Sequence, residues 1–521
     1  MQNAEFRVTP SPFVPSSLRP FVPLCNALLA ALASAAPINV NDPPPGRFVD
    51  QWLEIYMGGD KVGYGHSTMT RLQDRIHAAM EFTIRIARVD MAVEISVARR
   101  TTETIDARPL TFATEMKAAT MKTTTAGRVE DGKVTITTSQ FGMEQRQTYD
   151  YPKGSLMDWG LFRESIVRGF KPGTEYTVET YSPELRLDAA VPATTKVGEW
   201  EEFKHADRTM RGQKVTVTLN THMGPMEMIS WVDEDGNMIK SRVPMAGVGD
   251  MVMIAADEKT ALADFIPPEL FMTNTIKANR KIDADSADRI TYRVSLKQPP
   301  DDEADELSLP DTDMQKATKR TDGSLEVTVT RQTHQRPDGY SSDDLSPADR
   351  REYLGANLNI NTDDPELTKL AKKAAGGERD PYKLADRLRQ FVTDYVEEKN
   401  LTIAFATASE VARNKEGDCS EHGVLLAALG RINDLPSRVA VGLAYVPVFG
   451  RQDDIFGYHM WTQFYVDGRW LDVDAALRET SCSPTRIAFA TSSLQNTGLA
   501  DLSLPLLNKL GAIQVEIREI K

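Results

Sequence analysis

Gly417-Asp418-Cys419-Ser420-Glu421-His422 opens the stretch around which the C-terminal half of the chain is organised. Gly457-Tyr458-His459-Met460-Trp461 and Trp470-Leu471-Asp472-Val473-Asp474 complete it. A cysteine, a histidine and an aspartate are the residue types that a thiol nucleophile, its base and the group orienting that base require. We therefore interpret Cys419, His459 and Asp474 as a candidate catalytic triad.

Local sequence signals place Cys419 in the first turn of a buried helix. Asp418 suits the N-cap position, Glu421 lies three residues further on, and a mostly apolar run from Val424 to Leu429 follows. The N–H groups and the positive dipole end at a helix start favour the thiolate, which is the nucleophilic form of cysteine. Asp418 and Glu421 add negative charge that opposes this effect. We therefore expect a lowered thiol pKa to depend on an imidazolium at His459.

Three strands are predicted after this helix, over Arg438 to Tyr445, Tyr458 to Val466 and Arg469 to Ala475. Asp467-Gly468 joins the last two and is a strong signal for a two-residue hairpin turn. A helix that starts at the cysteine and faces strands carrying the histidine and the aspartate suits thiol acyl transfer. His422 competes as the base, but it lies on the cysteine's own helix and is expected to have a structural role.

Two aspartates compete for the third position of the triad. If the hairpin turn has two residues, Val466 pairs with Arg469, and both aspartates share one face with His459. Asp474 is then the diagonal neighbour of His459, with Cβ atoms within about 7–8 Å, whereas Asp472 is two residues further along the strand. We therefore assign Asp474 to the triad and expect Asp472 to be a rim residue in solvent.

Upstream of this stretch, the chain is predicted to form two β-rich parts. Residues 48–263 alternate apolar or β-branched residues with polar ones, with one amphipathic helix over Trp159 to Val167. This pattern is typical of an antiparallel curved sheet or open barrel. Pro267-Pro268 marks a boundary, and residues 264–345 are predicted to be a small β module. The candidate triad belongs to an α+β domain over residues 346–521.

The small β module contains an acidic run from Pro299 to Asp313. The run lacks the alternating ligands, central glycine and terminal glutamate of a calcium-binding loop. We therefore expect a solvated acidic loop with no bound calcium, and we predict no metal ion and no organic cofactor for this chain.

Residues 1–35 have the pattern of a secretory signal peptide. Two arginines precede a short apolar stretch, Leu24 to Ala33, and Ala33-Ser34-Ala35 offers small residues for cleavage. The alternative is a disordered cytosolic tail. Residues 36–47 are predicted to be a proline-rich linker. We expect an exported protein, periplasmic or extracellular, with no transmembrane segment in the mature chain.

Removal of the signal peptide would also remove Cys25 and leave two cysteines, Cys419 and Cys482. In an oxidising compartment these two could form a disulfide, which is the structural alternative for Cys419. Two cysteines are few for a disulfide-stapled protein, and a chain of 521 residues does not need the staple. We therefore expect Cys419 to be a thiol.

The charge of the chain limits its partners. The formal net charge is -14. Binding to nucleic acid or to an anionic membrane depends on clusters of basic residues, and the sequence has no such cluster. We therefore expect a peptide or protein substrate and no nucleic acid.

The C-terminal sequence resembles the transglutaminase-like superfamily of papain-type thiol enzymes, particularly its bacterial exported members. The resemblance covers roughly Leu354 to Thr491 and rests on GDCSEHGVLLAALGRINDLPSRVAVGLAYVP, FGYHMW and VDGRWLDVD, in that order. It implies an α+β core in which the helix bearing the cysteine packs on an antiparallel sheet. It also implies that Cys419 is the nucleophile, His459 the base and Asp474 the orienting carboxylate.

Two departures from the family pattern bear on activity. Family members usually have proline and threonine after the aspartate, whereas Ala475 and Ala476 follow here, which alters the turn. Cross-linking members carry an upstream tryptophan beside the oxyanion, and no tryptophan lies between Trp231 and Trp461. The oxyanion hole then has one inferred member, the backbone N–H of Cys419, and an unassigned second one.

The resemblance implies a thiol acyl-transfer enzyme that attacks amide bonds of peptides or proteins through a thioester. We expect hydrolysis, as in a protease or amidase, because water needs no dedicated acceptor site. One alternative is a protein-glutamine transglutaminase, which resolves the same thioester with an amine. The other is a non-catalytic transglutaminase-like scaffold, in which the β-rich part carries out recognition.

Overall fold

The structure is a computed structural model of the chain. Its described residues divide into two compact units, the first ending at Glu269 and the second running from there to the C-terminus. The predicted signal peptide, residues 1–35, and the acidic residues Asp301 to Glu306 lie outside the described residues. The structure describes residues 38–88, 91–118, 121–140, 143–205, 208–221, 224–244, 250–269, 275–297, 307–336, 345–357, 359–397, 406–450, 452–495 and 511–521.

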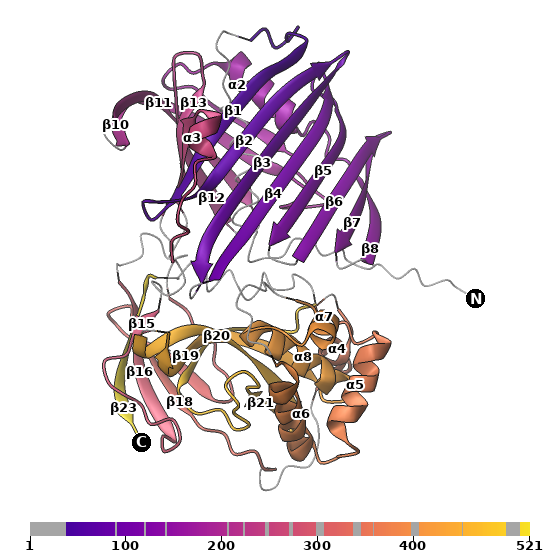
Figure 1. Cartoon of the computed structure of the whole chain (residues 1–521), viewed down its shortest axis with the longest axis vertical. Helices are drawn as coiled ribbons and strands as arrows, with labels where there is room; N and C mark the ends of the chain where they lie inside the picture. Colours follow the sequence, from indigo (N-terminus) through magenta and orange to yellow (C-terminus); the bar gives the residue numbers. More distant parts are fainter. Residues whose placement is uncertain are drawn as a thin grey trace, which may run out of the picture. The chain divides into compact units, whose positions relative to one another are not determined.

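The first unit is built on one antiparallel sheet of 14 strands. Strands β1 to β8 follow one another outward from β1, and β9 to β14 return along the other half so that β14 pairs with β1. Figure 1 shows β1 to β8 as a curved sheet, and β8 and β9 are the edges among the described strands. The predicted antiparallel curved sheet is confirmed.

The strands of this sheet have the following bounds: β1 Gly46–Met57, β2 Asp60–Leu72, β3 Arg75–Arg88, β4 Met91–Thr104, β5 Pro109–Ala118, β6 Met121–Glu130, β7 Lys133–Gln140, β8 Met143–Asp150, β9 Glu175–Thr180, β10 Val191–His205, β11 Arg208–Thr221, β12 Gly224–Val232, β13 Met238–Val243 and β14 Met251–Ala256.

The alternation seen in the sequence places one face of these strands in a core. In β1 every second residue from Val49 to Met57 is buried, as the period of two in a strand requires. Helix α2, Asp158–Arg168, packs on β3 and β4. Its residues Trp159 and Phe162 share a core with Met69 of β2. The predicted amphipathic helix is therefore present and covers this part of the sheet.

A buried charged cluster connects α2 to the sheet. Arg99 of β4 pairs with Asp158 and Glu184, and all three side chains are at most 2% exposed. Glu103, fully buried beside them, accepts two backbone N–H groups from the first turn of α2, at 2.6 and 3.0 Å. Burial and the charge of Asp158 raise the pKa of Glu103 to about 8, against these two hydrogen bonds. Glu103 is therefore largely protonated in the folded chain at neutral pH.

The second unit contains two antiparallel sheets. In the larger sheet the order is β15-β20-β19-β22, with β21 pairing on β20, and in the smaller it is β17-β18-β16-β23. The bounds are β15 Ile276–Lys277, β16 Arg289–Leu296, β17 Gln315–Lys319, β18 Leu325–Thr330, β19 Ser437–Phe449, β20 Gln452–Val466, β21 Arg469–Val473, β22 Arg486–Ser492 and β23 Ile513–Ile520.

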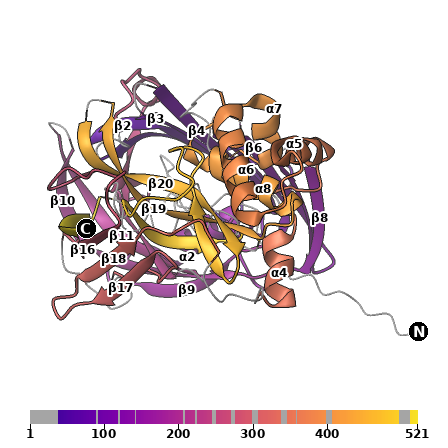
Figure 2. The same ribbon diagram turned by 90° about the horizontal axis from the view of Figure 1, so that it is seen from below.

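Helix α8 is the centre of the helical part of this unit. It packs on β20 and β19 and is surrounded by α5, α6 and α7, as Figure 2 shows. Helix α6 starts at Pro381, and the side chain of Asp380 caps it by accepting two backbone N–H groups. The helix bounds are α4 Pro347–Leu354, α5 Pro365–Ala375, α6 Pro381–Tyr395, α7 Ala408–Asn414 and α8 Cys419–Ile432; the short α3, Glu258–Ala261, belongs to the first unit.

The segment expected to be a small β module, residues 264–345, does not complete a sheet by itself. Its strands β16, β17 and β18 take β23 from the C-terminus as the fourth strand, and its β15 pairs with β20. Tyr292 of this segment shares a core with Phe456 and Ile487 of the larger sheet. Strand β23 thus covers the edge of β16, and the apolar face of the sheet packs against the larger sheet, while β17 stays an edge among the described strands.

Candidate active site

Helix α8 begins at Cys419, as the sequence predicts. Oδ1 of the N-cap residue Asp418 accepts the N–H of Ser420 at 2.8 Å, and Glu421 accepts the N–H of Asp418 at 2.9 Å. The side chain of Cys419 is half-buried and packs at the margin of the core beneath α8. The capping box therefore fixes the thiol in the first helical turn, at the positive end of the helix dipole.

The surroundings of Glu421 disfavour the negative charge that we expected it to carry near the thiol. It is fully buried, and its second carboxyl oxygen accepts the N–H of Ala406 at 2.9 Å. Burial and the charge of Asp418 raise the pKa of Glu421 well above its usual range. Gly417 makes room for it, because a Cβ at Gly417 would lie 2.2 Å from the Cβ of Glu421. A raised pKa favours the uncharged carboxyl of Glu421, which weakens one of the two charges expected to oppose the thiolate.

Helix α8 lies close to β20 at two positions. The hydroxyl of Thr462 donates to the carbonyl of Gly423 at 2.9 Å, one turn after the cysteine. Further along the helix, a Cβ at Gly430 would lie 2.2 Å from the ring of Phe464. Because Thr462 lies three residues after His459, this contact aligns the start of α8 with the part of β20 that carries the histidine.

The hairpin between β20 and β21 has the predicted register. Asp467 and Gly468 both have positive φ, 47° and 79°, as a two-residue type I′ turn requires. Val466 pairs with Arg469, and Gln463 with Asp472. The turn chemistry alone was therefore sufficient to place both aspartates on the same face of the sheet as the histidine.

His459 bonds Asp474 rather than Asp472. Its Nε2 lies 2.7 Å from Oδ2 of Asp474, and the other carboxylate oxygen accepts the N–H of Leu477 at 2.9 Å. Burial alone would raise the pKa of Asp474, but the charges of His459 and Arg486 hold it well below its usual range. An ionised carboxylate requires Nε2 to carry the proton of this hydrogen bond, so Nδ1 is the nitrogen that can take a proton from a thiol.

Asp472 is not the rim residue that we expected, because it is only 3% exposed. Its two carboxylate oxygens accept the indole N–H of Trp461 and the side-chain amide of Gln463, each at 2.6 Å. Its backbone N–H donates to Gln332, which lies beyond β18. Burial raises the pKa of Asp472 to about 6, against its hydrogen bonds to Trp461 and Gln463. Long-range packing, which the hairpin pattern does not encode, buries this face.

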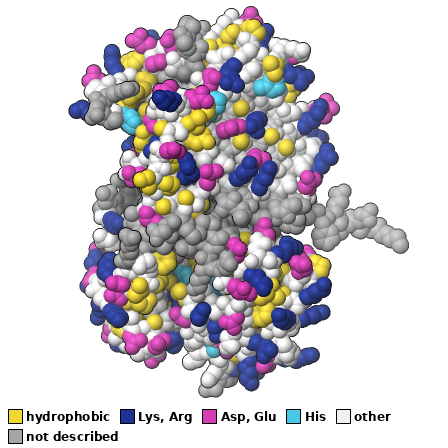
Figure 3. Space-filling view, viewed as in Figure 1, with side chains coloured by type: hydrophobic (Ala, Val, Ile, Leu, Met, Phe, Trp, Pro, Cys, Tyr) yellow, Lys and Arg dark blue, Asp and Glu magenta, His cyan; other side chains and the backbone are white. Residues whose placement is uncertain are grey.

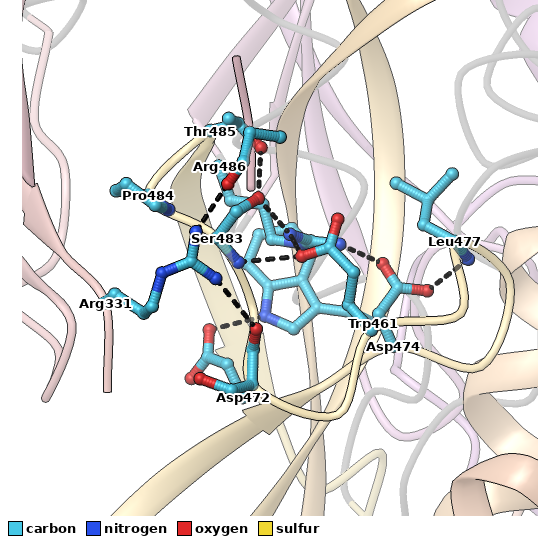
Figure 4. A network of polar contacts seen from close by, with 12 residues as sticks. Arg331, Trp461, Asp472, Asp474, Leu477, Ser483, Pro484, Thr485 and Arg486 are labelled. Atoms are coloured by element: carbon cyan, nitrogen blue, oxygen red, sulfur yellow. Dashed lines mark hydrogen bonds and ion pairs between the residues drawn. The ribbon is translucent and has the colours of Figure 1, made fainter. Parts of the chain in front are cut away.

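Arg486, at the start of β22, is the residue of this site that sequence reasoning missed. Its Nη2 lies 2.6 Å from Oδ2 of Asp474, the same oxygen that bonds His459, and its Nη1 lies 2.9 Å from Glu479. Figure 4 shows Arg486 beside Asp474, Ser483 and Trp461. A lone arginine in an apolar strand, Arg486-Ile487-Ala488-Phe489, was the available signal, because such a residue needs a buried partner.

The two cysteines of this unit are separate thiols and form no disulfide. Cys482 is fully buried in the core that contains Tyr292 and Ile487, and burial raises the pKa of its thiol well above the usual range. His422 has the expected structural role: it is buried, and its Nδ1 lies 2.6 Å from the carbonyl of Asp418.

Within the described ranges, no group of three or more His, Cys, Asp or Glu side chains is arranged to hold a metal ion. Of the helices described, none has both the length and the apolar character needed to cross a membrane. On the face drawn in Figure 3, basic and acidic side chains are interspersed over the described surface.

Residues 368–475 match a family model described as the transglutaminase-like superfamily. The match begins within α5 and ends one residue after Asp474, so it contains Cys419 and His459. The C-terminal unit thus carries a transglutaminase-like domain, the family that the sequence resembles. No curated protein matches the chain.

Two solved structures are similar to this chain. One is provisionally named a cysteine protease from Cytophaga hutchinsonii; it is 16% identical, with 45% of this chain and 86% of that chain covered and a TM-score of 0.28. The other is provisionally named a protease from Parabacteroides distasonis; it is 10% identical, with 71% of this chain and 68% of that chain covered and a TM-score of 0.19.

Proposed function

We propose that this chain is a thiol acyl-transfer enzyme that hydrolyses amide bonds of peptides or proteins. In this proposal Cys419 is the nucleophile, His459 the base and Asp474 the carboxylate that orients the base. One observation carries it: Nε2 of His459 lies 2.7 Å from Oδ2 of Asp474, on a strand that packs against the helix starting at Cys419. A half-buried thiol at a helix start and an oriented imidazole are the two groups that such chemistry requires.

The first half of the reaction forms a thioester. Nδ1 of His459 takes the proton of Cys419, and the thiolate Sγ forms a bond to the substrate's amide carbon. The negative charge on the carbonyl oxygen develops beside the N–H groups at the start of α8, which favour anions. The C–N bond then breaks, and the leaving amine takes the proton from Nδ1 of His459. The Nε2–H bond to Asp474 supports the imidazolium while it exists.

The second half resolves the thioester. His459 takes a proton from a water molecule, whose oxygen attacks the thioester carbon, and the C–S bond breaks to release a carboxylic acid and restore the thiol. An amine can replace the water and give a new amide, because the thioester is the same. We favour hydrolysis, since water needs no acceptor site of its own.

Incubation of the chain with casein and a fluorescent primary amine distinguishes hydrolysis from amine transfer. We expect the chain to release new casein fragments, seen by mass spectrometry, with little fluorescence incorporated into casein. Cys419→Ala is the control, and neither product should form with it. Amine incorporation without fragments would replace hydrolysis by transfer. The enzymatic proposal would be wrong if two results were found together. The chain would form neither product from several unrelated protein substrates, and its Cys419 would not react with acylating agents.

We also propose that the protein acts outside the cytoplasm, in the periplasm or the extracellular space. The support is the sequence pattern of residues 1–35, with its short apolar stretch and its small residues at Ala33-Ser34-Ala35. Expression of the full chain in a bacterial host, followed by N-terminal sequencing of the cell-envelope fraction, tests this. A new N-terminus near residue 36 supports export, and an intact chain confined to the cytosol contradicts it.

A further inference from the structure

The carboxylate that orients His459 is shared with a buried cation. We propose that Arg486 is a positioning residue that sets the protonation range of His459 by acting through Asp474. This inference deepens the proposed function and rests on it, because it concerns the base of that same site. It does not require Arg486 to touch a substrate.

The contacts of Arg486 give it this position. Its side chain is 2% exposed and bridges two carboxylates, with Nη2 at 2.6 Å from Asp474 and Nη1 at 2.9 Å from Glu479. Oδ2 of Asp474 accepts hydrogen bonds from both Nη2 of Arg486 and Nε2 of His459. Asp474 is 1% exposed and Glu479 is 27% exposed. Arg486 therefore reaches the base through a single buried oxygen, and its charge is balanced on the other side by a more accessible carboxylate.

The backbone keeps these groups in place. Asp474 and Glu479 exchange two backbone hydrogen bonds at 2.8 Å each, which closes the loop between them. The carboxylate of Glu479 also accepts the N–H of Ser483 at 2.7 Å. Arg486 itself pairs with Ala444 in the β19–β22 ladder. The guanidinium and both carboxylates are thus anchored by hydrogen-bonded backbone, which defines their distances to His459.

The other charged and titratable groups around this cluster come from several elements. Cys482 and Tyr292 lie close to Arg486, and burial raises the pKa of both well above their usual ranges, so both are neutral. The carboxyl of Asp472 on β21 interacts electrostatically with Arg486 and with Cys482. From α6, Asp386 and Arg389 bond the hydroxyl of Thr480 in the same loop, and from beyond β18 Arg331 donates to the carbonyl of Ser481. Arg438 of β19 also acts on Asp472, and the thiol of Cys419 lies at the start of α8. Among these groups, only Arg486 is a cation bonded to the carboxylate that binds His459.

The electrostatic consequence has a definite sign. A buried Asp474 carboxylate with no other partner would attract the imidazolium form of His459 strongly. Arg486 partly neutralises that carboxylate and repels a second cation at Nε2, so it favours the neutral imidazole that can act as a base. It also keeps Asp474 ionised, which burial alone would oppose. Removal of the arginine charge must therefore move protonation of the His459–Asp474 pair to higher pH, wherever the proton then resides.

Nuclear magnetic resonance of histidine side chains measures this directly, with the full chain labelled at histidine and carrying Cys419→Ala to remove thiol coupling. The resonance of His459 is assigned by its loss in His459→Gln. We expect Arg486→Met to raise the titration midpoint of His459 by about two pH units, the shift that a unit charge about 6 Å away produces at an effective dielectric constant near 20. We expect Arg486→Lys, which keeps the charge, to stay within about half a unit of the parent.

Glu479→Gln is the matched control, because it should shift the His459 midpoint in the opposite direction. It also tests the role of Arg486 if Arg486→Met does not fold. Without Glu479 the guanidinium charge acts more fully on Asp474, so the midpoint of His459 should fall, by less than it rises in Arg486→Met because Glu479 is partly exposed. Unchanged midpoints in folded variants, or an upward shift in Glu479→Gln, would overturn this role for Arg486. Since the readout needs no turnover, its failure is distinct from failure of the proposed function, which alkylation of Cys419 in the parent chain tests separately.

Discussion

The rings of His459 and Trp461 lie nearly parallel, with centroids 6.2 Å apart and an interplanar angle of 16°. The indole N–H of Trp461 in turn donates to Asp472 at 2.6 Å. The two aspartates of the hairpin therefore contact different partners: Asp474 bonds the candidate base itself, and Asp472 holds the aromatic ring that stacks beside it.

This difference predicts how the two aspartates respond to mutation. Asp474→Ala removes the group that orients His459, so we expect acyl transfer to fall by about 10²-fold to 10⁴-fold per folded molecule. Asp472→Ala should keep most of the activity per folded molecule. It should nevertheless cost about 1–3 kcal/mol of unfolding free energy for each stranded donor, because Trp461 and Gln463 lose a buried acceptor.

Ester hydrolysis and urea unfolding, measured on the same two preparations, check these expectations. The reverse ranking of activity in well-folded variants would show that Asp474 is not the orienting carboxylate. A stable Asp472→Ala variant would show that the buried acceptor is not needed for folding.

The two glycines of α8 provide a matched pair for its packing on β20. A Cβ at Gly423 would make an ordinary contact of 3.4 Å with Met460, whereas a Cβ at Gly430 would lie 2.2 Å from the ring of Phe464. We expect Gly423→Ala to be neutral or to stabilise by up to about 1 kcal/mol through helix propensity. Gly430→Ala should cost about 1–3 kcal/mol through overpacking. Denaturant midpoints for the two variants measure the difference, and equal midpoints would contradict this packing of α8 on β20.

Glu103 predicts a pH-dependent stability in the first unit. Its pKa is raised from 4.5 to about 8 in the folded chain. Between these values the folded chain holds a proton that the unfolded chain has lost, so stability falls as pH rises through that window. We expect Glu103→Gln to weaken the fall in melting temperature between about pH 5 and pH 8. Glu115→Gln is the control, because Glu115 lies near the surface and its pKa is lowered. If the slope is the same in the parent and in Glu103→Gln, Glu103 is not protonated as described.

Alkylation distinguishes the two thiols of the second unit. We expect iodoacetamide to label Cys419 well below about pH 8, whereas Cys482 stays unlabelled because it is 0% exposed. His459→Ala should slow labelling of Cys419 in this range, since the imidazolium no longer supports the thiolate. Peptide mapping assigns the label to each cysteine. Equal and slow labelling of both, or a disulfide between them in the purified protein, would favour a scaffold without catalysis.

Local chemistry was sufficient to predict much of this site. The capping residues Asp418 and Glu421 defined the start of α8, and Asp467-Gly468 defined the hairpin and its register, because each signal lies within a few residues of its effect. The buried Asp472 donates its backbone N–H to Gln332, which lies 140 residues away in sequence. The contact of Arg486 with Asp474 depends on how β22 pairs in the larger sheet. Such long-range contacts leave no periodic pattern in the sequence, so both were missed.

The fold shows the same difference between local and long-range signals. Alternation along each strand predicted an antiparallel curved sheet in the first unit. It did not predict that β23 would complete the sheet of β16, β17 and β18, because pairing partners far apart in the sequence are not encoded by a period of two. Turns and proline residues were the sequence signals from which the small β module was predicted. In the structure, the sheet of this segment also contains β23 from the C-terminus.

Acylation of Cys419 by p-nitrophenyl acetate, followed by acid quenching and peptide mapping, tests the central claim most directly. We predict a burst of nitrophenol equal to the enzyme concentration, with the acetyl group on the peptide that contains Cys419. The burst should be absent in Cys419→Ala and much slower in His459→Ala. A burst that persists in Cys419→Ala, an acetyl group on another residue, or an undiminished rate in His459→Ala would contradict the assignment of Cys419 as the nucleophile and His459 as its base.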